Sequence, residues 1–126
     1  MRAISFQHTA EQVRHRTKTV TRRMGWERLA ASTLLLACPK VRGVRREHRE
    51  ELAVIRAVSV RREPLRRMLD DKRYGRAEIR REGFEGHPEL GSPEAWVEWF
   101  CRAHKPCTPD TIITRIEFIY HDGALQ

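Results

Sequence analysis

The sequence predicts an α+β fold in which helices flank a small, curled or closed β-sheet. Short apolar and β-branched stretches, which are typical of strands, lie near both ends of the chain and in its middle. Stretches with helical caps and helical spacing lie between them. A chain of 126 residues has the length of one domain, and a curled sheet covers the apolar faces of about five or six short strands. We therefore expect residues 1–126 to form a single domain built on a small, mostly antiparallel sheet that is curled or closed.

The first quarter of the chain alternates between extended and helical segments. In chain order we expect a strand at residues 4–7, a helix at 9–16, a strand at 19–23, a turn at 24–26 and a helical turn at 27–31. Thr9 is the predicted N-cap of the helix, and Gln12 follows three residues later, as in a capping box. The second strand is predicted from its β-branched residues.

A hairpin is predicted in the middle of the chain. Residues 34–38 form a continuous apolar run, which indicates a buried strand. Residues 52–60 form a longer strand, and the charged residues 42–49 connect the two strands as a basic tip. Arg56 interrupts the face of the longer strand that we expect to be buried. That face consists of Leu52, Val54, Val58 and Val60.

Three helices are predicted before the last strand, at residues 64–70, 77–81 and 93–103. Pro64 suits the first turn of the first helix, and Gly83 ends the second. The third helix has Ser92 as its N-cap and Pro93 as its first residue. Its apolar residues recur at helical spacing and predict one buried stripe: Trp96, Trp99, Phe100 and Ala103.

The last predicted strand covers residues 111–120. Alternate residues of a strand share a face. One face therefore carries Ile112, Ile116, Phe118 and Tyr120. The other carries Arg115 and Glu117.

The chain is strongly basic. It has 25 Lys and Arg residues against 17 Asp and Glu residues, a net charge of +8 and a pI of about 10.2. A positive field attracts phosphates, which favours a nucleic-acid or nucleotide partner. A compositional bias of the source genome toward arginine codons would give the same charge without such a partner. No stretch approaches the ~20 apolar residues of a membrane span, and the N-terminus turns polar too early for a signal peptide. We expect a cytoplasmic protein with no membrane partner.

Several chemistries have no motif in this sequence. It lacks a glycine-rich phosphate loop, a Gly-x-Ser-x-Gly elbow and a His-Glu-x-x-His helix. Its three cysteines, Cys38, Cys101 and Cys107, are too few for a disulfide framework and are expected to be reduced. Cys101, His104 and Cys107 carry zinc-binding atoms, but no clear fourth ligand accompanies them. We expect no cofactor and no metal.

One segment resembles a family motif. Lys18-Thr19-Val20-Thr21-Arg22-Arg23, just after the first strand and helix, is similar to the signature of the ASCH domain, a relative of the PUA-like RNA-binding domains. Later features follow in a similar order: Glu63-Pro64-Leu65, Glu82-Gly83-Phe84, Ser92 to Val97 with Phe100, and Thr114 to Phe118. The resemblance implies a PUA-like β-barrel with flanking helices, a cleft beside residues 18–23, and a ligand that is single-stranded RNA or a nucleotide or nucleoside.

The resemblance also implies a candidate catalytic site. The family includes bacterial N4-acetylcytidine amidohydrolases, and ribonuclease activity is ascribed to other members. The amidohydrolases use a lysine, a threonine and a glutamate, which match Lys18, Thr21 and Glu82. Those enzymes have an apolar residue where this chain has Arg22, which puts their substrate in doubt here.

The three residue types suit amide hydrolysis. A threonine hydroxyl needs a base to become nucleophilic, and a lysine with a lowered pKa is such a base. Residues 18 and 21 would point to opposite faces of a regular strand. We therefore expect Lys18 to lie before the strand begins, in the turn after the helix. A hydrogen bond from Lys18 to Thr21, with Glu82 close by, would favour catalysis, and scattered positions would favour binding alone.

Basic and aromatic residues near the motif and on the hairpin tip are candidates for nucleic-acid contacts. They are Arg16, Lys18, Arg22, Arg23, Trp26, Arg45 and Arg46. If the motif and the tip line one cleft, they form a basic surface that can contact successive phosphates of a nucleic-acid backbone. Trp26 could stack on a base or pack in the core.

Four functions remain open at this point: an RNA or nucleotide binder, an amidohydrolase for a modified nucleoside, a metal-independent ribonuclease, and a module that binds an acidic protein. The alternative to a functional site is that residues 18–23 form an edge strand whose β-branched residues pack in the core and whose charged side chains face water. The sequence does not indicate an oligomeric state.

Overall fold

The computed structural model describes residues 1–122, and its strands form one five-stranded sheet in the order β1-β3-β4-β5-β2. The strands are β1 (Arg2–Ser5), β2 (Val20–Arg23), β3 (Leu34–Cys38), β4 (Ala53–Pro64) and β5 (Ile112–Tyr120). The helices are α1 (Ala10–Arg14), α2 (Arg67–Asp70), α3 (Lys72–Glu82) and α4 (Pro93–Ala103), with a 3₁₀ turn η1 (Arg46–His48). The mixture of one sheet and four α-helices confirms the predicted α+β class.

The sheet is mostly antiparallel. β3 pairs with β4, β4 with β5, and β5 with β2 in antiparallel fashion, whereas β1 pairs with β3 in parallel. β1 and β2 are the two edge strands, and within residues 1–122 they do not pair with each other. The sheet therefore does not close on itself between β1 and β2, and the predicted closed barrel is not confirmed.

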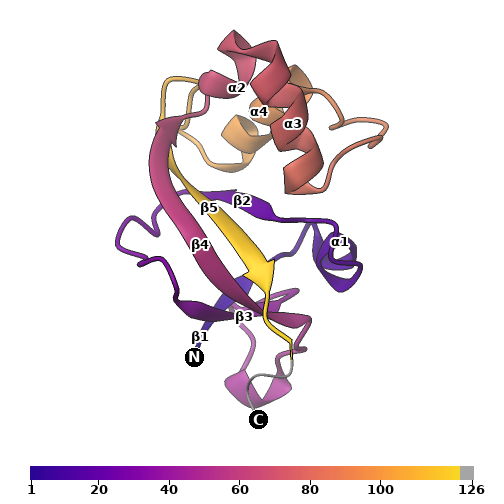
Figure 1. Ribbon diagram of the computed structural model, residues 1–126, viewed down its shortest axis with the longest axis vertical. Coiled ribbons are helices and arrows are strands. Elements are labelled where there is room, and N and C mark those ends of the chain that lie inside the picture. The colour runs from indigo at the N-terminus through magenta and orange to yellow at the C-terminus, as the bar shows by residue number, and fades with distance from the viewer. Residues whose placement is uncertain (123–126) are drawn as a thin grey trace.

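The buried apolar residues form two cores. The first core includes residues of β1, β3, β4 and β5 together with Val13 of α1. The second core joins α2, α3 and α4 to the start of β5 through Ile113. Figure 1 shows α2, α3 and α4 together at one end of the β4–β5 pair, with β2 below them and α1 apart from them.

Local signals in the sequence fix the two longest helices. In α4, the Ser92 hydroxyl accepts a hydrogen bond from the Ala95 amide at 3.2 Å, as predicted for an N-cap. In α3, Asp71 accepts one from the Tyr74 amide at 3.0 Å. Gly83 ends α3 with a φ of 92°, a left-handed conformation that glycine adopts without strain.

Some predicted elements differ from the observed ones. α3 begins five residues before the predicted helix at 77–81, because its first turn is capped by Asp71. Residues 27–31 form turns and no helix. Thr9 precedes α1 but makes no capping hydrogen bond with its side chain. The Gln12 side chain does not complete a capping box either, because its Nε2 donates to the Gly83 carbonyl at 3.2 Å.

The buried faces of the two long strands also differ from the prediction. In β4 the fully buried residues are Ile55 and Ala57, whereas Val58 is 42% exposed. A register shift between Ala57 and Ser59 changes the face that points inward along β4. In β5, Ile112 is exposed and Ile113 enters the second core instead.

The predicted hairpin is confirmed, with Leu34 opposite Arg56 and Leu36 opposite Val54. Its connection contains the η1 turn. Within residues 1–122, every helix is too short or too polar to cross a lipid bilayer.

Candidate ligand-binding site

A cavity of about 280 Å³ lies between the sheet and the helices. This volume is near the lower end of the roughly 300–1,000 Å³ range of small-molecule sites. Side chains of three regions line it: the segment after β1, the Lys18–Arg23 segment, and the facing parts of α3 and α4 with the loop between them. Its polar residues include Lys18, Thr21, Arg22, Arg23 and Glu82.

Lys18 and Glu82 form a buried ion pair in the cavity wall. Lys18 lies before β2, as expected, in the segment that links α1 to the strand. Its Nζ donates to Oε1 of Glu82 and to the Glu82 backbone carbonyl, both at 2.7 Å. Both side chains are almost completely buried, at 3% and 2% exposure. Burial lowers the pKa of Lys18, because the attraction of Glu82 offsets only part of the loss of hydration.

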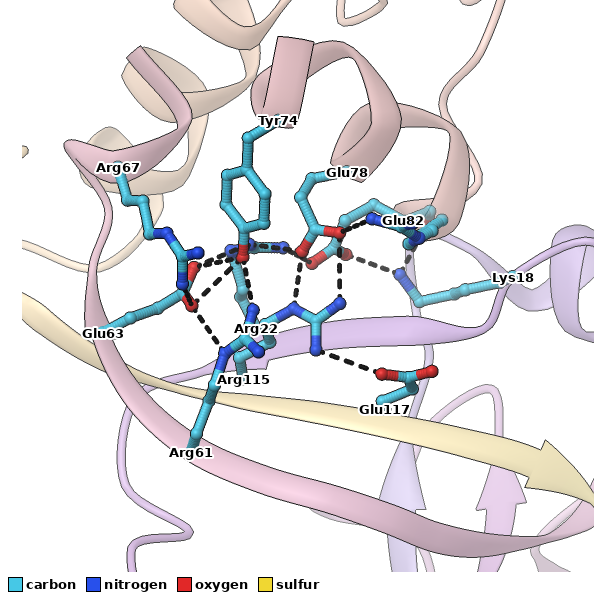
Figure 2. A network of polar contacts seen from close by, with 11 residues as sticks. Lys18, Arg22, Arg61, Glu63, Arg67, Tyr74, Glu78, Glu82, Arg115 and Glu117 are labelled. Atoms are coloured by element: carbon cyan, nitrogen blue, oxygen red, sulfur yellow. Dashed lines mark hydrogen bonds and ion pairs between the residues drawn. The ribbon is translucent and has the colours of Figure 1, made fainter. Parts of the chain in front are cut away.

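Arg22 lies on the other side of Glu82 and connects it to two more carboxylates (Figure 2). Its Nη1 donates to Glu82 Oε2 at 3.2 Å. Its Nη2 donates to Glu78 Oε1 at 2.6 Å and to Glu63 Oε2 at 3.0 Å. The Arg22 side chain has no exposed surface. Burial alone would lower the pKa of Arg22, but the charges of Glu82 and Glu78 raise it.

The two additional carboxylates are each held by several donors. Glu78, from α3, accepts from Arg115 of β5 at 2.6 and 3.1 Å and from Arg81 at 2.7 Å. Glu63, from β4, accepts from Tyr74 at 2.8 Å and from Arg61 at 2.9 Å. Burial opposes their ionisation, but these hydrogen bonds and the charge of Arg22 lower the pKa of both glutamates.

Thr21 and Arg23 form a second polar pair in the cavity wall. Both lie on β2, two residues apart and therefore on one face. Nε of Arg23 donates to the Thr21 hydroxyl at 2.9 Å, and its Nη2 donates to the Ser5 carbonyl. Within residues 1–122, Thr21 makes no hydrogen bond with Lys18, whose ammonium is directed to Glu82. The cavity therefore contains all three candidate catalytic residues without a direct lysine–threonine contact.

The remaining wall is aromatic. Phe6, Phe84, Trp96 and Phe100 are buried, Trp99 is partly exposed, and His8 and His104 are exposed at the rim. The rings contact one another: Trp99 lies 5.9 Å from Phe84 and 5.2 Å from His8 between centroids. Of the stripe predicted for α4, Trp96 and Phe100 belong to the second core and Trp99 packs against it, whereas Ala103 is exposed. All four residues line the cavity.

Four other predicted contact residues do not line this cavity. Arg16 is exposed, pairs with Asp122 and lies 5.3 Å from the Tyr120 ring. Trp26 packs against the first core, with the Arg2 guanidinium 3.8 Å from its ring centroid. Arg45 and Arg46 are exposed in the β3–β4 connection, near the η1 turn. The motif and the hairpin tip therefore do not line one cavity.

The candidate zinc ligands do not converge. Sγ of Cys101 and Sγ of Cys107 lie 3.5 Å apart, but His104 stacks on Phe100 with ring centroids 4.2 Å apart. Nδ1 of His104 lies 2.9 Å from the Phe100 carbonyl oxygen. Within residues 1–122, no three His, Cys, Asp or Glu side chains are grouped as metal ligands.

The sequence analysis singled out Glu82 as a site residue, but it did not assign a role to the other residues that surround the motif in space. Tyr74, Glu78 and Glu82 recur every four residues along α3 and therefore share one helix face. That spacing is visible in the sequence and could have linked Glu78 to Glu82. Nothing in the sequence indicated that Glu63 and Arg115, from β4 and β5, would meet this face.

Comparison with known proteins identifies the fold. No family model matches the sequence, and no curated protein matches it. Protein EF3133 from Enterococcus faecalis, of the family DUF984, matches with a TM-score of 0.62 and 17% identity, over 94% of this chain and 78% of that chain. The ASCH domain from Lactobacillus crispatus matches with a TM-score of 0.62 and 15% identity, over 94% and 79%.

A third structure extends the comparison. A mutant of ZmASCH from Zymomonas mobilis matches with a TM-score of 0.56 and 15% identity, over 92% of this chain and 66% of that chain. At these identities the likeness concerns the fold. The resemblance predicted from the Lys18–Arg23 segment is confirmed at that level: the chain has the fold of solved ASCH domains.

Proposed function

We propose that this protein binds a nucleobase, carried by a nucleoside, a nucleotide or single-stranded RNA, in the cavity beside Lys18, Thr21 and Glu82. The observation that carries the proposal is the combination of a buried polar group and an aromatic wall in one cavity. Nucleobases are flat, have hydrogen-bonding edges and stack on aromatic rings. The resemblance to ASCH domains, through the Lys18–Arg23 segment and the shared fold, supports the same ligand class.

The geometry favours binding of a single base in the cavity over binding of an extended stretch of RNA. Arg22 forms ion pairs with three carboxylates and has no exposed surface, so it is not available to contact the phosphates of an RNA backbone. Arg45 and Arg46 lie outside the cavity lining. A single base entering between Trp99 and the polar residues would use the groups that the cavity presents.

Calorimetric titration with the four ribonucleosides, their monophosphates and a short single-stranded RNA tests this proposal. Trp99→Ala should lower the affinity about tenfold or more, since base–aromatic stacking contributes roughly 1–3 kcal/mol. Trp26→Ala, which removes an indole packed outside the cavity, is the control and should leave binding of a single nucleotide unchanged. Absence of binding to every one of these probes would refute the proposal.

Hydrolysis of a small amide on such a base is the second candidate, and one observation favours it. The Thr21 hydroxyl accepts a hydrogen bond from the Arg23 guanidinium, which stabilises an alkoxide over an alcohol. Because no hydrogen bond joins Lys18 to Thr21 within residues 1–122, the reaction requires the neutral Lys18 amine to turn from Glu82 toward Thr21. Thr21 Oγ1 would then attack the amide carbon and pass its proton to Lys18. Lys18 would then protonate the departing amine, and water would release the acyl group from Thr21. Glu82 would hold Lys18 and exchange protons with it.

Turnover of an N4-acetylated cytidine, followed by release of acetate, tests this reaction. Lys18→Ala and Thr21→Ala should abolish it while the folded circular dichroism spectrum is retained. The same variants test the ribonuclease alternative: RNA cleavage that persists in EDTA and is lost in Lys18→Ala would favour it. Intact substrate in both assays would leave binding as the function.

A further inference from the structure

Arg23 differs from the other arginines that are buried at this site. Arg22 and Arg115 each form ion pairs with at least two carboxylates. Arg23 forms none within residues 1–122: its acceptors are the Thr21 hydroxyl and the Ser5 carbonyl, both uncharged. A partly buried guanidinium without a carboxylate is unusual, because such charges are normally paired.

The guanidinium of Arg23 still has donors to offer. A guanidinium carries five N–H groups, and the two contacts of Arg23 use Nε and Nη2. Its Nη1 donates to nothing in the part of the chain that the structure describes. The Thr21 hydroxyl accepts from Arg23 and also donates to no group there, so its own hydrogen is available. Because both residues line the cavity, they present a pair of adjacent donors to its contents.

The charged residues that line the cavity are mostly basic: Lys18, Arg22 and Arg23 against Glu82. Within residues 1–122, the ion-pair network that extends from Lys18, Arg22 and Glu82 away from the cavity contains six cations and four carboxylates. The cations are Lys18, Arg22, Arg61, Arg67, Arg81 and Arg115, and the carboxylates are Glu63, Glu78, Glu82 and Glu117. The network is positive even with every carboxylate ionised, and Arg23 adds one more charge. Glu82 is the acidic residue of the cavity lining, and it is paired with Lys18 and Arg22.

We infer that the cavity recognises an anionic group, a carboxylate or a phosphate, placed against Arg23 and Thr21. The planar guanidinium fork and the adjacent hydroxyl match the oxygen atoms of either group. The position of Arg23 is set before binding, since the Thr21 and Ser5 contacts and the Phe6 ring, 4.9 Å from the guanidinium carbon, hold it. This inference rests on the proposed nucleobase site and narrows its ligand: the ligand is an acidic nucleotide or nucleoside instead of a neutral one.

Three probes separate the two sources of negative charge. Uridine is neutral, orotidine carries a carboxylate on the base, and uridine 5′-monophosphate carries a phosphate on the ribose. We expect at least one acidic probe to bind the wild-type protein about tenfold or more tightly than uridine, as a charge-assisted pair of hydrogen bonds should allow. Its advantage should fall as salt rises. Preference for orotidine would place the anionic group on the base, and preference for the monophosphate would place it on the ribose. The same comparison with cytidine and adenosine monophosphates covers a different base preference.

Arg23→Gln should abolish the advantage of the acidic probe over uridine, measured as the ratio of their two affinities for the same variant, and Arg23→Lys should keep part of it. Arg76→Gln is the control, because it removes an exposed arginine of α3 that does not line the cavity. Equal affinity of the wild-type protein for neutral and acidic probes would overturn the inference, even if Arg23→Gln fails to fold.

A separate measurement distinguishes failure of this inference from failure of the nucleobase site. The thermal midpoint of wild-type protein should be higher in phosphate or acetate than in chloride at equal ionic strength, and this difference should vanish in Arg23→Gln. If no nucleoside or nucleotide binds but this anion effect is present, the anion site stands and the nucleobase site falls. If nucleosides bind, but neither anion raises the thermal midpoint and the acidic probes bind no more tightly than uridine, the anion site is refuted and the nucleobase site stands.

Discussion

Arg22 and Glu78 form a 2.6 Å salt bridge in which neither side chain has any exposed surface. Arg22 belongs to β2 and Glu78 to α3, so this pair ties an edge strand of the sheet to the helices above it (Figure 2). Removal of water from two charges is unfavourable, and only multiple hydrogen bonds make the pair tolerable. The bonds to Glu63, Glu82 and Arg115 supply them.

Loss of the Glu78 charge should destabilise the fold strongly. Glu78→Gln keeps the side-chain volume but leaves Arg22 and Arg115 without their shared carboxylate. Breaking a buried pair on one side typically removes about 3–5 kcal/mol from the free energy of unfolding. Urea denaturation measures this loss. The matched control is Glu98→Gln, whose exposed pair with Arg102 contributes about 0.5 kcal/mol or less. A Glu78→Gln variant as stable as that control would contradict the view that the network is structural.

Stability should decrease in acid because of two carboxylates. The pKa values of Glu63 and Glu78 are lowered in the folded protein, so the unfolded chain binds more protons in the acid range. Their stabilising effect is fully present above the ordinary carboxyl pKa of about 4.3 and is lost as the pH falls toward the folded-state values. Free energies of unfolding measured between about pH 3 and about pH 7 should show this slope. In Glu78→Gln the slope should be shallower; an identical slope would assign the pH dependence to other groups.

The sequence predicted those elements whose signals are local. β3 and α4 occur at the predicted residues, because an uninterrupted apolar run and a Ser-Pro cap with an apolar stripe need no distant partner. The Lys18–Arg23 segment was expected beside a cleft, and the cavity lies there. Lys18 also precedes its strand, as the two-residue side-chain period requires if it is to share a site with Thr21.

The ion-pair network could not be predicted in the same way. Its members come from β2, β4, α2, α3, β5 and the segment before β2, and the rule that buried residues are apolar assigns each of them to the surface. The inward face of α3 carries Glu78 and Glu82, so it has no apolar stripe to reveal it in the sequence. Only the three-dimensional register of β2 against β5, with Arg22 opposite Arg115, brings these charges together.

Gly75 should not tolerate a larger side chain. It is buried in α3, where an added Cβ would meet the Met68 carbonyl oxygen of α2 and would lie 2.9 Å from Cγ of Pro93. Because backbone atoms of α2 cannot move aside, Gly75→Ala should lower the free energy of unfolding by about 1–3 kcal/mol, although alanine favours helices. Thermal unfolding measures the change. Arg76→Ala, at the next and exposed position, should change it by less than about 0.5 kcal/mol. A stabilised Gly75→Ala protein would show that α2 and α3 are less closely packed than described.

Charge reversal on the hairpin tip should separate two kinds of RNA contact. Arg45 and Arg46 are exposed and do not line the cavity, so Arg45→Glu/Arg46→Glu should leave the affinity for a single nucleotide unchanged. If the tip contacts the backbone of a longer RNA, the same double variant should weaken binding of a single-stranded oligonucleotide. It should also reduce the dependence of the affinity on salt, by roughly one ion released for each lost phosphate contact. Titrations of a mononucleotide and an oligonucleotide at several salt concentrations measure both effects. Equal losses for the two ligands would mean that the tip acts on the cavity itself, and no loss for either would limit recognition to the cavity.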